Sequence, residues 1–248
     1  MRAYETGSRA AFDRSARSKP IASWKHFFGF LAFMAVTAAL GLRAQHAAAG
    51  AAPGQIADHG KAIYVYLVAG FMDWALLYYC WAGVHHHGGN LDTLSGGRWT
   101  SWKGVAVDVA IAAPFWGLWE ATAYAVHWLL GPSSAKSVTD LLPRSLLEIV
   151  IWIGVSITAG VCEELAFRGY LQRQFHALSG NVAVAVVAQA LVFGVAHSYQ
   201  GWKQVIVISV FGVLYGSLAA WRRNVRATVI AHAWADIWGG WLRTAILR

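Results

Sequence analysis

Long apolar stretches separated by short polar loops are the feature that most limits how this 248-residue chain can fold. A helix needs roughly 20 predominantly apolar residues to cross the hydrocarbon core of a bilayer. Helices also satisfy their own backbone hydrogen bonds, which lipid cannot do. Seven stretches come close to that length, at 26–42, 62–84, 104–130, 146–163, 182–198, 204–221 and 227–246. The pattern predicts an all-α fold, a multi-pass transmembrane helical bundle of about seven to eight spans.

The composition supports a membrane protein and excludes a nucleic-acid-binding one. Apolar residues make up 57% of the chain and charged residues only 13%, about half the charged share of an ordinary soluble domain. The net charge of +8 comes from basic residues scattered over a tail and short loops. No basic face with interleaved aromatic residues is present. We therefore expect the lipid bilayer, and no nucleic acid, as a partner.

The distribution of basic residues predicts domain organisation and orientation. Residues 1–25 are expected to form a basic cytosolic tail, and residues 26–248 one bundle. If the tail is cytosolic, thirteen of the 20 Lys and Arg residues fall on the cytosolic side. This excess follows the positive-inside rule, so we expect an integral plasma-membrane protein with a cytosolic N-terminus. The small residues that follow the first span would suit a cleaved signal peptide, but we favour an uncleaved anchor because the charged region before it is long.

Ionisable residues within the apolar stretches are the candidates for function, because each is costly in a membrane. For several of them a structural role is the simpler interpretation. Asp73 and Asp108 are single acids that would suit a helix contact or a position near an interface, and Glu148 stands near a span end where water is expected. Glu120 and His127 are seven residues apart on one face and would suit a structural pair. The two cysteines, Cys80 and Cys162, are expected to be buried apolar residues rather than a disulfide.

The segment 161–175 combines two adjacent carboxylates with a nearby guanidinium. Arg168 follows Glu164 at i+4, which places the two side chains on one helix face. The predicted pair keeps Glu164 ionised and leaves Glu163 in a different environment. Unequal environments give two neighbouring carboxylates different pKa values, so that one can act as a base while the other stays ionised. A solvated helix that leaves the membrane would explain this segment equally well if it stood alone.

Two histidines in later stretches favour the functional interpretation. His197 ends the fifth stretch, and His232 lies in the seventh with Asp236 at i+4, close enough to orient its imidazole. Helical rise places Glu163 and His197 level, at ~24 and ~26 Å above a turn at 179–180, if the fourth helix continues that far. If that helix also protrudes into the cytosol, His232 shares their depth. The estimate predicts one site whose mouth opens in the cytosolic half of the membrane.

At these residues the sequence resembles the CAAX protease and bacteriocin-processing family of intramembrane proteases, also called the Abi family. The family's motifs Glu-Glu-x-x-x-Arg, Phe-x-x-x-His and His-x-x-x-Asn/Asp read here as EELAFR, FGVAH and HAWAD. They begin at Glu163, Phe193 and His232 and follow in the family's order on successive late spans. The resemblance covers about 145–240; earlier residues match only in being hydrophobic.

The resemblance implies an endopeptidase that acts on a membrane-attached protein or on a lipidated or secreted peptide precursor. It assigns four catalytic residues and three supporting ones. Glu163 and His197 would activate water, and Glu164 would act with Arg168 as a supporting pair. His232 would stabilise the oxyanion. The supporting residues are Arg168, Asp236 and Phe193. Where some members have Asn this chain has Asp236, which as an anion would repel an oxyanion, so we assign it to orienting His232.

Two alternatives stay open at this point. A site without metal and a zinc site held by Glu163, His197 and His232 are both compatible with these residue types. The second alternative is a membrane transporter or assembly scaffold that uses intramembrane acids as a proton relay. Transporters often contain two related halves, and no such repeat is visible. The run 85–87 of three histidines is expected to be a solvated loop.

Overall fold

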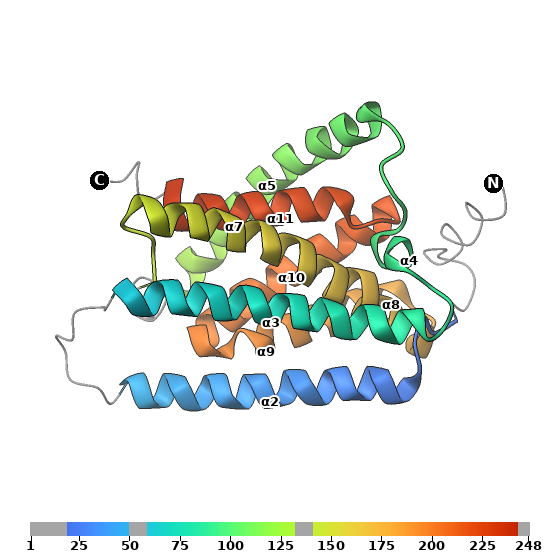
Figure 1. The fold of residues 1–248 in the computed structure, drawn as a ribbon, viewed down its shortest axis with the longest axis horizontal. Helices are drawn as coiled ribbons and strands as arrows, with labels where there is room; N and C mark the ends of the chain where they lie inside the picture. The colour runs from blue at the N-terminus through green and yellow to red at the C-terminus, as the bar shows by residue number, and fades with distance from the viewer. Residues whose placement is uncertain (1–18, 50–58, 132–140, 243–248) are drawn as a thin grey trace.

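The computed structural model describes residues 19–49, 59–131 and 141–242, and every regular element in these ranges is a helix (Figure 1). The all-α prediction is therefore confirmed for the described part of the chain. Most of the predicted tail 1–25, and residues 50–54 of the small-residue segment after the first span, lie outside the described residues. The elements are α2 (Trp24–Ala49), α3 (His59–His85), α4 (Leu91–Ser95), α5 (Trp102–Leu130), α7 (Leu146–Glu163), η1 (Glu164–Leu171), α8 (Gln172–Ser179), α9 (Val182–Ala196), η2 (Ser198–Gln200), α10 (Trp202–Arg222), α11 (Arg226–Ile237) and η3 (Trp238–Leu242).

Each of the seven predicted spans overlaps a helix in the structure, and residues 243–246 of the seventh lie outside the described residues. Four segments of the described chain have both the length and the apolar character of a membrane span: Trp24–Arg43, Ala62–His85, Leu146–Ser179 and Trp202–Arg222. The helix α9 is apolar but shorter, and α5 and α11 occupy the other two predicted stretches. The chain is an integral membrane protein built as a helical bundle.

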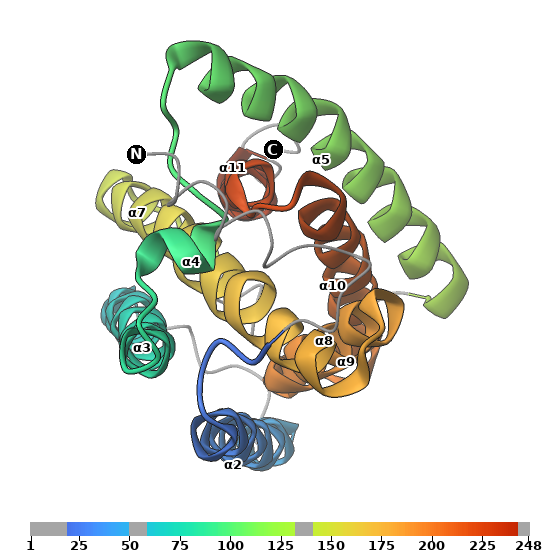
Figure 2. The same cartoon turned by 90° about the vertical axis from the view of Figure 1, so that its right-hand side faces the viewer.

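The continuous rod formed by α7, η1 and α8 runs through the middle of the bundle (Figure 2). Its first half packs against α3 and α11, and its last part packs against α9. The helices α9 and α10 form a closely packed pair, α2 lies on α9 and η2, and α5 covers α10 and α11. The central rod is thus the element that can bring side chains from several late helices together.

Local sequence signals explain where the central rod begins and ends. Ser145 accepts a hydrogen bond from the backbone N–H of Glu148, and the Glu148 carboxylate accepts one from the Ser145 N–H. This capping box satisfies backbone donors at the start of α7. Glu148 is only 2% exposed, so the expectation that it meets water is wrong: it is buried because it caps the helix. Gly180, in the left-handed region with φ 67°, ends the rod.

Asp108 ties α5 to the turn between α10 and α11. Its buried carboxylate lies 2.9 Å from Arg222 and 3.1 Å from Arg226, and it accepts a hydrogen bond from the Trp99 indole. The predicted structural role of Asp108 at a helix contact is confirmed. Cys80 and Cys162 are buried free thiols, also as predicted.

Candidate active site

The two adjacent glutamates stand where the central rod changes its helical form. Glu163 is the last residue of α7, and Glu164 begins the π-helix η1. A π-helix is rare and is frequently found at functional sites. All eight residues of η1 are buried, polar ones included. The fourth helix continues to a turn at 179–180, as expected. Regular α-helical rise does not hold along its whole length, because η1 is a π-helix. No signal in the sequence marked this π-helical segment.

The predicted ion pair between Glu164 and Arg168 is present and completely buried. Arg168 Nη1 lies 2.8 Å from Glu164 Oε1, and both side chains are 0% exposed. The same carboxylate oxygen accepts a hydrogen bond from His232 Nδ1 at 2.8 Å. Glu164 therefore holds two partners, one from its own rod and one from α11. It fixes the orientation of the His232 ring.

Aromatic rings enclose the guanidinium of Arg168. Its Cζ atom lies 4.5 Å from the centre of the Phe193 ring, 5.5 Å from that of Phe211 and 5.9 Å from that of Tyr215. Cation–π attraction of this kind is strongest when the charge is desolvated. The prediction that Phe193 supports the site thus has a physical basis. Phe211 and Tyr215 were not predicted, because aromatic residues at i, i+4 in an apolar helix resemble ordinary core residues.

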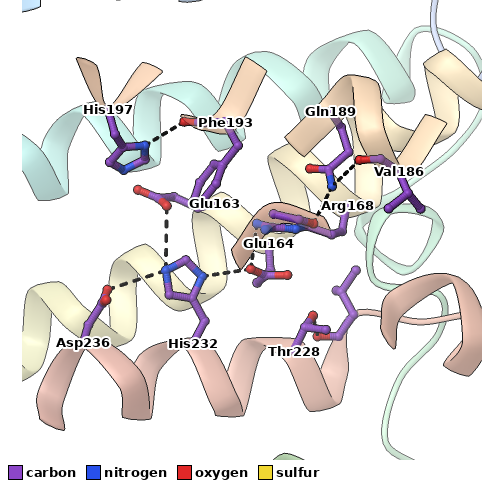
Figure 3. A network of polar contacts seen from close by, with 12 residues as sticks. Glu163, Glu164, Arg168, Val186, Gln189, Phe193, His197, Thr228, His232 and Asp236 are labelled. Atoms are coloured by element: carbon purple, nitrogen blue, oxygen red, sulfur yellow. Dashed lines mark hydrogen bonds and ion pairs between the residues drawn. The ribbon is translucent and has the colours of Figure 1, made fainter. Parts of the chain in front are cut away.

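The second ring nitrogen of His232 faces two further carboxylates. His232 Nε2 lies 3.8 Å from Glu163 Oε2 and 3.6 Å from Asp236 Oδ2. Both distances are longer than a hydrogen bond. Glu164 is therefore the closer partner that orients His232, a role that the sequence suggested for Asp236. Figure 3 shows the three carboxylates arranged around this one imidazole.

His197 enters the site from the end of α9. Its Nδ1 atom lies 2.8 Å from the carbonyl oxygen of Phe193, one turn earlier in the same helix. A carbonyl can only accept, so Nδ1 carries the hydrogen, and Nε2 of the neutral ring is left as an acceptor. In Figure 3 the His197 ring and the Glu163 carboxylate point toward each other. The site thus presents two acceptors that face the same space.

A close approach of α7 and α11 brings the glutamates to His232. Gly160 lies one turn before Glu164, and a Cβ atom at this position would stand 2.8 Å from the backbone nitrogen of Ala233. A side chain would therefore push the two helices apart. The absence of a Cβ at Gly160 allows the 2.8 Å contact between Glu164 and His232.

A cavity of about 980 Å³ contains Glu163, His197, His232 and Asp236 in its wall. The structure therefore brings together all the residues that the motifs singled out: Glu164 and Arg168 lie directly behind the cavity, bound to His232 and packed on Phe193. Their catalytic roles stay predictions. The arrangement supplies partly buried acceptors, a hydrogen-bonded imidazole and space for an extended ligand.

The residues that line the cavity lie toward the end of the bundle away from the basic turn after α10. The described part of α3 contributes residues 65–76 to its wall, α5 contributes 119–127, and α10 contributes 204–211. Leu141 and Gln200, from the loops at that end, also line it. The lining extends away from the basic turn after α10, toward the 141–145 and 198–201 connections. With that turn in the cytosol, this lining favours an opening on the opposite side rather than the predicted cytosolic mouth.

Asp73, expected from the sequence to lie at a helix contact or near an interface, stands in the cavity wall. It stands on α3, which packs against α7, and it lines the same cavity as Glu163. It is close enough to interact electrostatically with His232 and Asp236. Its position in the sequence, 90 residues before Glu163, gave no signal of this proximity.

The residue types suit zinc, but their arrangement does not form a ligand set. Among the residues that the structure describes, no three His, Cys, Asp or Glu side chains are grouped so that they could hold one metal ion. The Nδ1 atoms of His197 and His232 are already engaged, with a carbonyl and a carboxylate respectively. A site with zinc and a site without metal both stay hypotheses.

The fold and the site together define a class: a helical integral membrane protein whose carboxylate and imidazole groups line a cavity suited to hydrolysis. Residues 145–238 match the family model described as type II CAAX prenyl endopeptidase Rce1-like. The matched segment extends from the start of α7 to the first residue of η3 and contains all three motifs. This segment agrees with the predicted resemblance to the CAAX protease family. No curated protein and no solved structure matches the chain.

Proposed function

We propose that this protein hydrolyses a peptide bond in a membrane-attached protein or lipidated peptide, and that Glu163 and His197 activate the attacking water. The supporting observation is the pair of acceptors that face one cavity, beside an imidazole held in place by Glu164. The family match favours this function over a transporter or scaffold with a proton relay.

The chemical steps use the chain's own carboxylates and imidazoles. A water between Glu163 and His197 donates one hydrogen to each acceptor. Glu163 takes a proton as the water oxygen attacks the carbonyl carbon, and His197 Nε2 aligns the remaining O–H. The carboxylic acid of Glu163 then returns the proton to the amide nitrogen as the C–N bond breaks. General-base catalysis of this kind contributes ~10² to 10⁴ in rate.

His232 is the group placed to stabilise the oxyanion. Its Nδ1–H donates to Glu164, and the nearby carboxylates of Glu163 and Asp236 favour a second proton on Nε2. A doubly protonated ring can donate Nε2–H to the tetrahedral oxygen. Preorganised donors of this kind are worth about 10² to 10³ in rate. Arg168 stabilises Glu164 and does not contact the substrate.

We further propose that the chain lies in the plasma membrane with a cytosolic N-terminus, as the excess of basic residues on that side favours. With this orientation the cavity extends toward the side opposite the cytosol. A substrate would then reach Glu163 from that half of the membrane. This orientation is independent of the chemistry and can fail without it.

The experiment compares two histidines with the same local geometry. His127 lines the same cavity, and its Nδ1 bonds the Ala123 carbonyl at 2.8 Å, as His197 does with Phe193. Purified protein in liposomes would be given lipid-anchored, internally quenched peptides. His197→Ala should lower kcat/KM by ~10² or more, and His127→Ala should have a much smaller effect. Equal losses, or cleavage that survives His197→Ala, would contradict the proposal.

A further inference from the structure

The walls of the active-site cavity carry several acidic side chains close to the reactive groups. The described residues that line it there include the carboxylates Asp73, Glu163 and Asp236, and no Lys or Arg is among the described lining residues. This contrasts with a chain whose net charge is +8. The basic residues of the protein lie outside the described lining of the cavity. The cavity is therefore more acidic than the chain as a whole, which would favour a ligand with positive charge.

The charges immediately around the reactive groups do not balance either. Asp73, Glu163, Glu164 and Asp236 interact with one another through His232 or directly. Arg168 and a protonated His232 supply at most two positive charges for these four carboxylates. Arg168 is also enclosed behind the Phe193 ring and bound to Glu164. Uncompensated charge in a partly buried site is costly, so a further cation or shared protons must offset it.

Asp73 is the carboxylate best placed to meet such a cation. No hydrogen bond or ion pair of the described residues involves Asp73, whereas Glu163, Glu164 and Asp236 all contact His232. The aromatic rings of Tyr66, on α3, and Trp152, on α7, line the same cavity and pack edge to face at 5.3 Å. Such rings can cover the aliphatic stem of a long basic side chain while its charged end reaches a carboxylate.

We infer that Asp73 is a specificity-determining residue that binds a Lys or Arg side chain next to the scissile bond of the substrate. The preferred substrate class is therefore a membrane-attached peptide with a basic residue adjacent to the cleaved bond. The inference rests on the proposed peptidase function and adds the charge of the substrate. Asp73 lies outside the matched segment 145–238, so this preference belongs to the part of the chain that the family model does not cover.

The test uses lipid-anchored, internally quenched peptides that differ only at the residues flanking the scissile bond, which carry Lys, Gln or Glu. Intact wild-type protein in liposomes should cleave Lys peptides with a kcat/KM about tenfold above Gln peptides, which corresponds to about 1.4 kcal/mol. Glu peptides should be the poorest. Asp73→Asn should bring the Lys-to-Gln ratio close to one, whatever its absolute rate, and Asp73→Glu should restore much of the ratio. Asp92→Asn, an acid on α4 outside the cavity, should leave the ratio unchanged.

The outcomes separate the inference from the function on which it rests. Equal cleavage of Lys and Gln peptides by the wild type would overturn the inference, favour shared protons, and leave the peptidase function standing. A Lys preference that survives Asp73→Asn would also overturn the role of Asp73. Absence of cleavage of every peptide would refute the peptidase function and the inference together. If Asp73→Asn does not fold, the Lys-to-Gln ratio of kcat/KM is measured for the wild type at rising salt concentration. An ionic contact weakens with salt, so the ratio should fall, and a constant ratio would overturn the inference.

Discussion

Replacing Glu164 by glutamine removes the charge partner of a guanidinium that has no access to solvent. Glu164 and Arg168 are both 0% exposed and 2.8 Å apart. Leaving one charge of a buried pair without its partner typically costs about 3 to 5 kcal/mol. In a chain of this size 1 kcal/mol shifts the melting temperature by about 2 to 4 °C. Glu164→Gln should therefore lower the apparent Tm in detergent by roughly 6 to 20 °C, and it should also lower activity because His232 loses its orienting partner.

The double variant Glu164→Gln/Arg168→Met tests the reason for the loss. Methionine removes the unpaired charge and keeps an apolar stem against Phe193, so the double variant should be more stable than Glu164→Gln alone. Activity should not return, because the carboxylate that holds His232 is still absent. If the double variant is less stable than either single one, the two residues do not act as a pair and the reasoning is refuted.

A second ion pair in the chain provides the matched control. Arg98 and Asp92 are 2.7 Å apart, yet their side chains are 77% and 31% exposed. Exposed pairs contribute about 0 to 1 kcal/mol. Asp92→Asn should therefore change the Tm by no more than ~4 °C. An equal fall in Tm for Asp92→Asn and Glu164→Gln would show that burial does not determine the loss of stability when an ion pair is broken.

The remaining predictions concern packing, access and metal. Gly160→Ala should lower both the melting temperature and the activity, by about 1 to 3 kcal/mol in stability, because its Cβ meets Ala233; Gly154→Ala, with no atom within 4 Å, should not. A cysteine at Gln204 should react with an impermeant thiol reagent only from the side opposite the cytosol, and one at Asp92 only from the cytosolic side; the reverse pattern would invert the proposed orientation. Cleavage should persist after exhaustive treatment with a chelator, and its loss with recovery on adding Zn²⁺ would establish a metal-dependent mechanism.

The late helices and the ion pair between Glu164 and Arg168 were predictable because both depend on local spacing. Apolar length marks the spans, and an i, i+4 pair survives the change from α- to π-helix. The motifs fixed which residues meet, since Glu163, His197 and His232 share one cavity. The depth and direction of that cavity were not predictable from helical rise, because tilt and the π-helix alter where each residue stands.

The contribution of α3 to the site was also beyond prediction. Asp73 is one acid in an apolar helix, and its meaning depends on α3 packing against α7, a contact between distant parts of the chain. The packing of the Phe211 and Tyr215 rings around Arg168 likewise depends on contacts between helices that are distant in the sequence. Glu164, rather than the expected Asp236, is the closer partner of His232. The reason is that α11 packs closely against the central rod at Gly160, which brings His232 to Glu164 at the start of η1.

The most direct test of the central claim follows the oxygen of water through the reaction. Wild-type protein and Glu163→Gln would be incubated in liposomes with a lipid-anchored peptide in H₂¹⁸O, and the products analysed by mass spectrometry. The wild type should release a fragment whose new carboxyl group carries one ¹⁸O. Glu163→Gln, folded and with an unchanged melting temperature, should form this product ~10² to 10⁴ times more slowly. Near-normal formation of the labelled product by Glu163→Gln would show that Glu163 does not activate the water and would contradict the proposed mechanism.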